Sequence, residues 1–205
     1  MKVSRGFTPS EILNTQYDVF DFDNDFFDAF GNPERYGVWF IWGNSANGKT
    51  SFALKLAKYL ARFERVAYNS LEEGRSKTIR DSFERVGMEE VEGRFILIQD
   101  EIAQLRTRLK RQRSPKVVFI DSLEYTGLTF KRFLNFVREF PKHLFVFIAH
   151  ARGSQPRSKL GESVMYHADL KIWVEGYKAL SKGRYIGDVG EMVIWEEGAK
   201  RYWGN

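Results

Sequence analysis

The 205-residue chain contains no cysteine and only three histidines, and it has no long apolar run. Without cysteine it can form no disulfide, no zinc site with cysteine ligands and no cysteine nucleophile. Three histidines leave little basis for a metal site built from several imidazoles. The longest apolar runs, such as Leu144–Ala149, fall far short of the roughly 20 residues that cross a bilayer, and the N-terminus lacks the apolar run of a signal peptide. We therefore expect a soluble, cytoplasmic protein with no membrane partner.

The composition is that of a folded domain, with 43% hydrophobic and 29% charged residues. These fractions allow a sizeable core and do not favour disorder. The chain has no internal repeat and no linker rich in Pro, Gly or Ser, so we expect a lead-in over residues 1–35 and one domain over residues 36–205. The net charge of +5 is compatible with a polyanionic partner but does not require one.

The lead-in contains an unusual mixture of aromatic and acidic residues between positions 18 and 28. Asp21, Asp23 and Asp25 have the spacing of a calcium loop, but Phe26 stands where that loop needs Gly, and no Glu closes it. We therefore expect the aromatic rings to pack on the core while the aspartates stay in solvent. The alternative is an arm that docks on a neighbouring subunit.

Apolar runs alternate with segments of helical spacing along the rest of the chain, which is typical of an α/β fold with a mostly parallel sheet flanked by helices. The C-terminal part is expected to be a β-hairpin, with arms near 177–186 and 191–197. The expected strands are 38–42, 66–70, 95–98, 117–121, 144–149 and 170–174. The expected helices follow the first strand, end at Gly87, span about 101–112, and include 130–137.

A phosphate-binding loop follows the first expected strand. Gly43, Gly48, Lys49 and Thr50 satisfy the pattern G-x-x-x-x-G-K-[ST], and a helix comes directly after them. The glycines permit torsions that a Cβ would penalise, so the backbone amides and the helix N-terminus can surround phosphates. Lys49 is expected to reach the β- and γ-phosphates of ATP, and Thr50 to ligate Mg²⁺. The expected binding residues are Gly43, Asn44, Ser45, Ala46, Asn47, Gly48, Lys49, Thr50 and Ser51.

A second acidic position comes at the end of the strand 117–121. Asp121 would lie at the carboxyl edge of the sheet, beside the phosphate loop, where a carboxylate can hold Mg²⁺ through water. Thr50 and Asp121 are therefore the expected metal residues.

The segment Ser70-Leu71-Glu72-Glu73 resembles the corresponding segment of RecA-like ATPases, especially the RadA and DnaB families. DnaB-like proteins carry Ser-Leu-Glu here, and RadA-like proteins carry a Glu-Glu pair. The resemblance implies that Glu72 is the general base that orients the attacking water, with Glu73 as the alternative. The other interpretation is two surface glutamates in a turn.

Ile120-Asp121-Ser122 and His150 extend this resemblance. The Asp-Ser pair is similar to that of RecA and RadA. The position of His150, after the strand 144–149, holds a polar residue that senses the γ-phosphate in this branch, and an imidazole can donate such a hydrogen bond. His150 could also simply be a satisfied residue at a strand end.

The segment Lys182-Gly183-Arg184-Tyr185-Ile186-Gly187 looks like the Lys-x-Arg-x-Gly segment of RadA and DnaB, with one extra residue before the closing Gly. In those families the basic pair reaches the ATP site of the next subunit. The resemblance implies that Lys182 and Arg184 act there in trans. The alternative is a solvated basic hairpin.

Together the four features identify residues 36–205 as a three-layer RecA-like P-loop ATPase domain of the RadA, DnaB and KaiC branch. The chain lacks the additional domains of RadA and of replicative helicases, so it resembles a compact stand-alone core such as phages and mobile elements carry. The resemblance implies a homo-oligomer, a ring or a filament, with ATP at the subunit interfaces.

The loop after His150 is basic and has no large apolar residue. Its cations Arg152, Arg157 and Lys159 are suited to contact phosphates of single-stranded DNA, although any exposed loop can have this composition. A second basic cluster lies between residues 106 and 116, where a solvated helix face is the better interpretation.

The sequence therefore favours an ATPase that acts on DNA as a recombination, repair or replication accessory, with a helicase or recombinase as candidate partner. One alternative is a KaiC-like regulatory ATPase that switches protein partners without nucleic acid. A small-molecule P-loop kinase, with residues 151–159 as its lid, is the third hypothesis.

Overall fold

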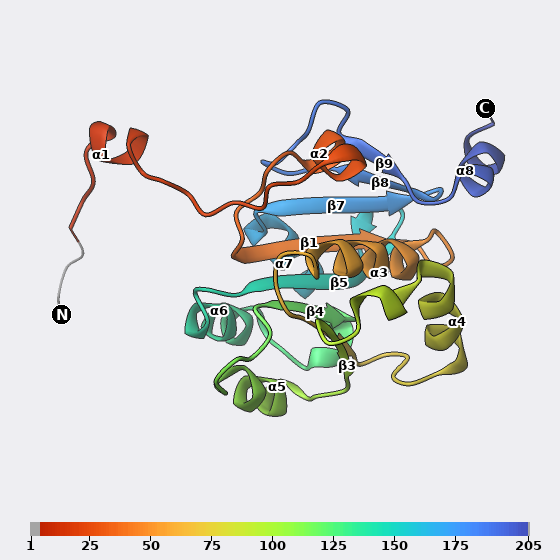
Figure 1. Ribbon diagram of the computed structural model, residues 1–205, viewed down its shortest axis with the longest axis horizontal. Helices are drawn as coiled ribbons and strands as arrows, with labels where there is room; N and C mark the ends of the chain where they lie inside the picture. Colours follow the sequence, from red (N-terminus) through yellow and green to blue (C-terminus); the bar gives the residue numbers. More distant parts are fainter. Residues whose placement is uncertain (1–4, 205) are drawn as a thin grey trace.

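The computed structural model describes residues 5–204, which form an α/β fold around one large twisted sheet (Figure 1). The strand order is β3-β2-β4-β5-β1-β7-β8-β9, with β6 paired to the end of β5. The strands from β3 to β7 are parallel, and β8 and β9 continue the sheet in antiparallel fashion. The strands are β1 Gly37–Gly43, β2 Val66–Ser70, β3 Phe95–Ile98, β4 Val117–Asp121, β5 Leu144–Arg152, β6 Gln155–Pro156, β7 Leu170–Glu175, β8 Lys178–Ser181 and β9 Glu191–Val193.

Helices cover both faces of the sheet, which gives the three layers expected from the sequence (Figure 1). They are α1 Pro9–Leu13, α2 Asn24–Phe30, α3 Lys49–Leu60, α4 Lys77–Val86, α5 Ile102–Leu109, α6 Phe130–Glu139, α7 Lys159–His167 and α8 Glu196–Trp203, with short 3₁₀ helices η1 Met88–Val91 and η2 Leu123–Thr126. Within residues 5–204, no helix combines the length and the apolar character needed to cross a membrane.

The apolar run of β1 is explained by burial on both sides. Trp39 and Ile41 point into the core cluster beneath α2 and α3, whereas Phe40 and Trp42 point into the cluster beneath α5, α6 and α7. Because successive strand residues face opposite sides, a central parallel strand must be apolar throughout. β1 lies between β5 and β7, and its carboxyl end carries the phosphate loop.

The predicted elements up to residue 175 are confirmed. β2, β3 and β4 have the predicted bounds, and α4 ends where predicted, with Gly87 in the left-handed conformation at φ 70°. Ser76 caps the start of α4, because its side chain accepts a hydrogen bond from the backbone N–H of Ile79. These elements were predictable because burial periodicity and capping residues are local in the sequence.

The C-terminal part differs from the prediction. The antiparallel pair is present, but its first arm ends at Ser181 instead of near residue 186, and its second arm ends at Val193. Residues 196–203, expected in part as strand, form helix α8. Acidic residues fill the first turn of α8 and basic residues its last turn, which is the arrangement that the helix dipole favours.

The aromatic residues between positions 18 and 28 pack on the core, as expected. Phe20 and Phe22 are buried, and the ring of Phe20 meets Trp39 edge to face. Asp21 and Asp25 are exposed, and Asp23 accepts hydrogen bonds from Tyr59 and Arg62. Phe20, Phe22 and Phe30 are buried in their own chain, and Phe26 and Phe27 are partly buried against the same cluster. The packing of these rings therefore does not support the alternative, in which this segment docks on a neighbouring subunit.

Candidate functional site

The phosphate loop connects the end of β1 to the first turn of α3. Gly48 has φ +95°, which confirms that a Cβ would be penalised there. The reason predicted for Gly43 is wrong, because its backbone does not have a positive φ. A Cβ on Gly43 would instead lie 2.1 Å from the carbonyl oxygen of Val174 on the adjacent strand β7. The motif therefore needs one glycine for torsion and the other for close packing.

Helix α3 begins at Lys49, so Lys49, Thr50 and Ser51 form its first turn. Free N–H groups and the positive end of the helix dipole point from such a turn toward any bound anion. The Lys49 Nζ atom donates a 2.9 Å hydrogen bond to the carbonyl oxygen of Asn44 within the loop. Burial lowers the pKa of Lys49, and the charges of nearby carboxylates, Asp121 foremost, oppose that shift.

Asn47 fixes the loop to the C-terminal half of the sheet. Its Oδ1 atom accepts from the backbone N–H of Gly176 at 2.8 Å, and its Nδ2 donates to the carbonyl oxygen of Ser45 at 2.9 Å. Gly176 belongs to the turn between β7 and β8. The loop is thus anchored by a side chain whose partner lies 129 residues further along the chain.

Asp121 ends β4, separated from β1 by β5 alone. Its Oδ2 atom accepts a 2.6 Å hydrogen bond from the hydroxyl of Tyr68 on β2. Burial raises the pKa of Asp121 to about 6, and the hydrogen bond from Tyr68 opposes this rise. The carbonyl oxygen of Asp121 accepts from the N–H groups of Leu71 and Glu72, which ties the segment after β2 to the end of β4.

Glu72 and His150 meet at this edge of the sheet, although 78 residues separate them. The Oε2 atom of Glu72 lies 3.0 Å from Nε2 of His150. Glu72 follows β2, whereas His150, predicted to come after its strand, lies within β5 because that strand continues to Arg152. Glu73 also lines the cavity here, and it accepts a hydrogen bond from the Thr78 hydroxyl at 2.8 Å.

Glu124 belongs to this cluster and was not predicted. Its Oε1 atom accepts from the backbone N–H of His150 at 3.3 Å, and its buried Oε2 has no hydrogen-bond partner among residues 5–204. The available signal was a carboxylate just after Asp121-Ser122, at the same sheet edge. η2 turns this carboxylate back toward β5, which the sequence pattern does not indicate.

Both predicted metal residues, and four of the nine predicted binding residues, line one cavity of about 210 Å³: Ser45, Ala46, Lys49 and Thr50 from the loop and α3, and Asp121 from β4. Lys49, Thr50 and Asp121 line it together with Glu72 and His150. The residues that the structure describes contain no group of three or more acidic or histidine side chains able to hold an ion. Because Mg²⁺ is usually bound by one or two carboxylates together with substrate phosphates, the Thr50 hydroxyl and the Asp121 carboxylate fit such an ion.

A second and larger cavity, about 560 Å³, also adjoins the phosphate loop. Gly48 and Ser51 line it from the loop, and Tyr177 and Trp195 supply aromatic rings whose centroids are 5.0 Å apart at 86°. Trp195 is 44% exposed, so its ring is accessible. Sequence reasoning missed this cavity because its walls come from α3, α4 and the C-terminal segment, which are far apart in the sequence.

The structure does not bring Lys182 and Arg184 into either cavity. Arg184 lies 3.7 Å from Asp169, whose carboxylate accepts from the N–H of Val38 at the start of β1. That is the end of β1 opposite to the phosphate loop. The Lys182 Nζ atom lies 5.6 Å from the ring centroid of Trp173. Both side chains are exposed, and neither can serve its own chain's site from this position.

The loop predicted to contact DNA is a short hairpin. β6 pairs with Ala151 and Arg152, and the carbonyl oxygens of Gly153 and Ser154 accept from Asn44 and Trp42. The side chains of Arg152, Arg157 and Lys159 are exposed on or beside this hairpin. The hairpin is therefore connected directly to the strand and the loop that hold the phosphate site.

Half of the basic cluster on and after α5 forms ion pairs, namely three of its six cations. Arg106 and Lys110 both contact Glu139 at 2.7 Å, and Arg108 contacts Asp100 at 2.5 Å. In these ion pairs, carboxylates of the same chain neutralise the cations.

Comparison with solved structures establishes the fold. The chain superposes on a KaiC-like protein from Pyrococcus horikoshii with a TM-score of 0.60 and 17% identity, over 82% of this chain and 94% of that one. It superposes on the flagellar accessory protein FlaH from Methanocaldococcus jannaschii with a TM-score of 0.61 and 15% identity, over 87% and 99%. No family model matches the sequence, and no curated protein matches it.

The molecule thus has the RecA-like P-loop NTPase fold predicted from the sequence, in the three-layer form with a mostly parallel sheet. At these levels of identity the likeness establishes the fold alone. The chemistry of the site must be argued from its own residues.

Proposed function

We propose that this chain binds Mg²⁺–ATP and hydrolyses it. The observation that carries the proposal is the shared cavity, in which Lys49, Thr50 and Asp121 meet Glu72 and His150. A loop that merely bound an anion would need no carboxylate beyond the phosphate position. Glu72 provides one, held by the backbone bond to Asp121 and by His150.

The aromatic cavity supports a nucleotide instead of a simple phosphate. Both cavities are lined by residues of the phosphate loop and the start of α3, so a nucleotide held there can place its terminal phosphate near Glu72 and its base near Trp195. An aromatic ring offers a base a stacking surface.

Each residue has a defined role in this proposal. Lys49 neutralises phosphate charge, and Thr50 and Asp121 hold Mg²⁺, directly or through water. Glu72 accepts the proton of the attacking water as general base, and His150 responds to the terminal phosphate through its contact with Glu72. The chemistry that Mg²⁺ supplies is stabilisation of the charge on the phosphates.

Titration calorimetry with Mg²⁺–ATP tests this proposal. The Lys49→Ala variant should lose measurable binding, because the loop loses its only lysine. Lys131→Ala, which removes an exposed lysine of α6, is the matched control and should bind as wild type does. Unchanged affinity in Lys49→Ala would contradict the proposal.

We further propose that the ATPase acts on single-stranded DNA as a recombination, repair or replication accessory, within a homo-oligomer. Exposed Arg152, Arg157 and Lys159 support the action on DNA, because they lie on or beside the hairpin that is hydrogen-bonded to Asn44 and Trp42. Lys182 and Arg184 lie away from the cavity of their own chain, as a role in the site of a neighbouring subunit requires. Their placement therefore supports the homo-oligomer. A helicase or recombinase is the candidate partner.

The test is the ATPase rate with and without single-stranded DNA at several salt concentrations. Stimulation should fall steeply as salt rises, and a variant with Ala at 152, 157 and 159 should lose it. The matched control has Ala at 131, 132 and 142, which removes the same charge from exposed positions on and after α6.

A KaiC-like regulatory ATPase, which switches protein partners without nucleic acid, is the second candidate. The likeness to the KaiC-like structure favours it as strongly as the hairpin favours DNA. A rate that does not respond to DNA at any salt concentration, combined with normal Mg²⁺–ATP binding, would select this candidate.

A further inference from the structure

The turn between β7 and β8 lies between the phosphate loop and helix α8. It consists of Gly176 and Tyr177 and joins the paired strand residues Glu175 and Lys178. On one side the N–H of Gly176 donates to the side chain of Asn47 in the phosphate loop. On the other side α8 contacts the turn through its aromatic side chains. The turn therefore connects the C-terminal helix to the phosphate loop.

One peptide unit of this turn makes hydrogen bonds in both directions. The carbonyl oxygen of Gly176 accepts a 3.1 Å hydrogen bond from Nε1 of Trp203 on α8. The N–H of Tyr177, which belongs to the same peptide unit, donates to the carbonyl oxygen of Asn47 at 3.3 Å. Because a peptide unit is planar and rigid, its two polar groups turn together. The bond from Trp203 therefore helps to fix the direction of the N–H that reaches the phosphate loop.

The rings of α8 lie directly against Gly176. A Cβ at this position would come within 2.3 Å of Cδ1 of Tyr202 and within 2.7 Å of Nε1 of Trp203. The ammonium group of Lys178 lies 5.8 Å from the centroid of the Trp203 ring, a distance at which a cation attracts the face of an indole. Trp203 is thus held at the turn, although 42% of its surface is exposed.

The turn has a backbone form that its sequence does not favour. Both residues have positive φ, +52° for Gly176 and +61° for Tyr177. Two-residue hairpins take one form with positive φ at both positions and another with positive φ at the first position alone, where glycine is preferred. The pair Gly-Tyr suits the second form, because tyrosine rarely adopts a positive φ. The two forms differ in the direction of the peptide unit between the residues, so the contacts of that unit hold the observed form.

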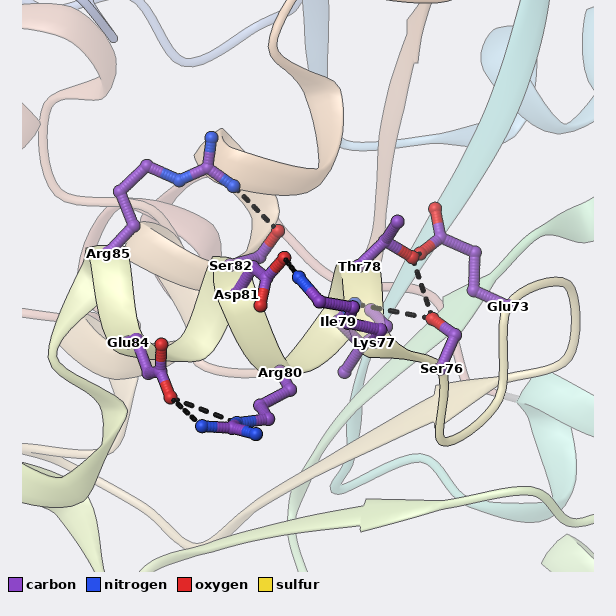
Figure 2. Close-up of polar contacts among 10 residues, drawn as sticks. All are labelled: Glu73, Ser76, Lys77, Thr78, Ile79, Arg80, Asp81, Ser82, Glu84 and Arg85. Atoms are coloured by element: carbon purple, nitrogen blue, oxygen red, sulfur yellow. Dashed lines mark hydrogen bonds and ion pairs between the residues drawn. The ribbon is translucent and has the colours of Figure 1, made fainter.

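Helix α4 also borders the aromatic cavity, but its polar contacts follow another pattern (Figure 2). Arg85 lines the cavity and donates a 3.0 Å hydrogen bond to Ser82 of the same helix. At the other end of α4, the Thr78 hydroxyl donates to Glu73. The contacts drawn in Figure 2 join residues 73–85 to one another, whereas the contact of Trp203 leads to Asn47. This difference indicates that α8 is the helix that acts on the phosphate loop.

We propose that Trp203 is a positioning residue for the phosphate loop. Its bond to Gly176 keeps the N–H of Tyr177 directed at Asn47, and this supports the loop in the shape that surrounds phosphates. Without that bond, the turn relaxes toward the form that Gly-Tyr favours, in which this N–H turns away from Asn47. The proposal rests on the Mg²⁺–ATP site put forward above. A movement of α8 then changes nucleotide affinity, and bound nucleotide stabilises α8 in return.

The Trp203→Phe variant tests this role, because it keeps an aromatic ring at the turn and removes the N–H donor. Titration calorimetry should show binding of Mg²⁺–ATP weakened by roughly two- to tenfold, the effect of one lost hydrogen bond. Inorganic triphosphate with Mg²⁺, which has no base, should lose affinity to the same extent. The matched control is Tyr202→Phe, which removes the hydroxyl that donates to Glu175 at 3.1 Å and should bind both ligands as wild type does. Circular dichroism checks that both variants are folded.

A second variant, Tyr177→Gly, separates positioning from a general loss of packing. Glycine adopts positive φ without penalty, so the turn keeps its form without help from Trp203. Combined with Tyr177→Gly, Trp203→Phe should therefore weaken triphosphate binding less than it does alone, which a double-mutant cycle measures. Triphosphate is the ligand here because the Tyr177 ring lines the aromatic cavity.

Three results would overturn the positioning role and leave the nucleotide site intact. They are wild-type affinity in Trp203→Phe, an equal loss in Tyr202→Phe, and an effect of Trp203→Phe that is the same with and without Tyr177→Gly. A wild-type protein that does not bind Mg²⁺–ATP would overturn the nucleotide site and the positioning role together.

Discussion

At the scale of single residues, the proposed hydrolysis assigns the role of general base to Glu72. Its carboxylate lies 3.0 Å from His150 and shares a cavity with Lys49. Glu72→Gln keeps the shape but cannot accept a proton. We expect Mg²⁺–ATP affinity close to that of wild type and a turnover lower by about 10²–10⁴-fold. Calorimetry and a phosphate-release assay measure the two quantities, and Glu73→Gln is the neighbouring control.

His143 makes stability depend on pH. It is 5% exposed beside the rings of Phe140 and Phe145, and neither ring nitrogen has a hydrogen-bond partner among the described residues. Burial, aided by the charge of Lys116, lowers its pKa from 6.5 to about 4. A lowered pKa means that the unfolded chain binds the proton more tightly. The contribution to stability is therefore complete above pH 6.5 and is lost as pH falls toward 4.

We expect His143→Phe to lose this dependence, because phenylalanine keeps the aromatic packing and cannot be protonated. Between pH 7 and 5, the free energy of unfolding of wild type should fall by about 2 kcal/mol relative to the variant. Urea unfolding at both pH values measures it. Comparison with the variant is needed because Asp121, whose pKa is raised to about 6, acts in the opposite direction. Equal changes in both proteins would exclude this role for His143.

At the scale of elements, the junction of β1 with β7 limits what position 43 can hold. A Cβ there would lie 2.1 Å from the carbonyl oxygen of Val174, which is backbone and cannot move aside as a side chain can. We expect Gly43→Ala to lower the free energy of unfolding by about 1–3 kcal/mol, as overpacking does, and to weaken nucleotide binding. Gly6→Ala is the control, because its Cβ would meet no atom within 4 Å. A Gly43→Ala variant as stable as Gly6→Ala would contradict this reading.

The elements differ in how far the sequence predicts them. β2, β3 and β4 were predicted to the residue, because each is a short apolar run between polar turns. α8 was missed because Met192, Ile194 and Trp195 extend a strand-like pattern up to its first residue. α1, α2 and α7 were also not predicted. These helices are short, so their apolar residues span too few turns for helical spacing to be recognised.

At the scale of the whole molecule, Arg184 lies away from its own site, which predicts that it acts in the site of a neighbouring subunit. Lys49→Ala removes nucleotide binding, and a variant with Lys182→Ala and Arg184→Ala removes the basic pair. Each should be inactive alone. When they are mixed, the second protein keeps an intact nucleotide site and the first supplies the basic pair, so turnover should reappear in part. Phosphate release from mixed subunits measures it, and no recovery would refute action in trans.

The sequence by itself determined the class of fold and the phosphate loop, because strand burial, helix capping and the G-x-x-x-x-G-K-[ST] turn depend on neighbouring residues. The meeting of Glu72, His150 and Glu124 depends on the strand order that places β2, β4 and β5 side by side. The same is true of the distance between Arg184 and its own site. Tertiary structure decided these, since contacts between distant segments follow from packing, which no local pattern records.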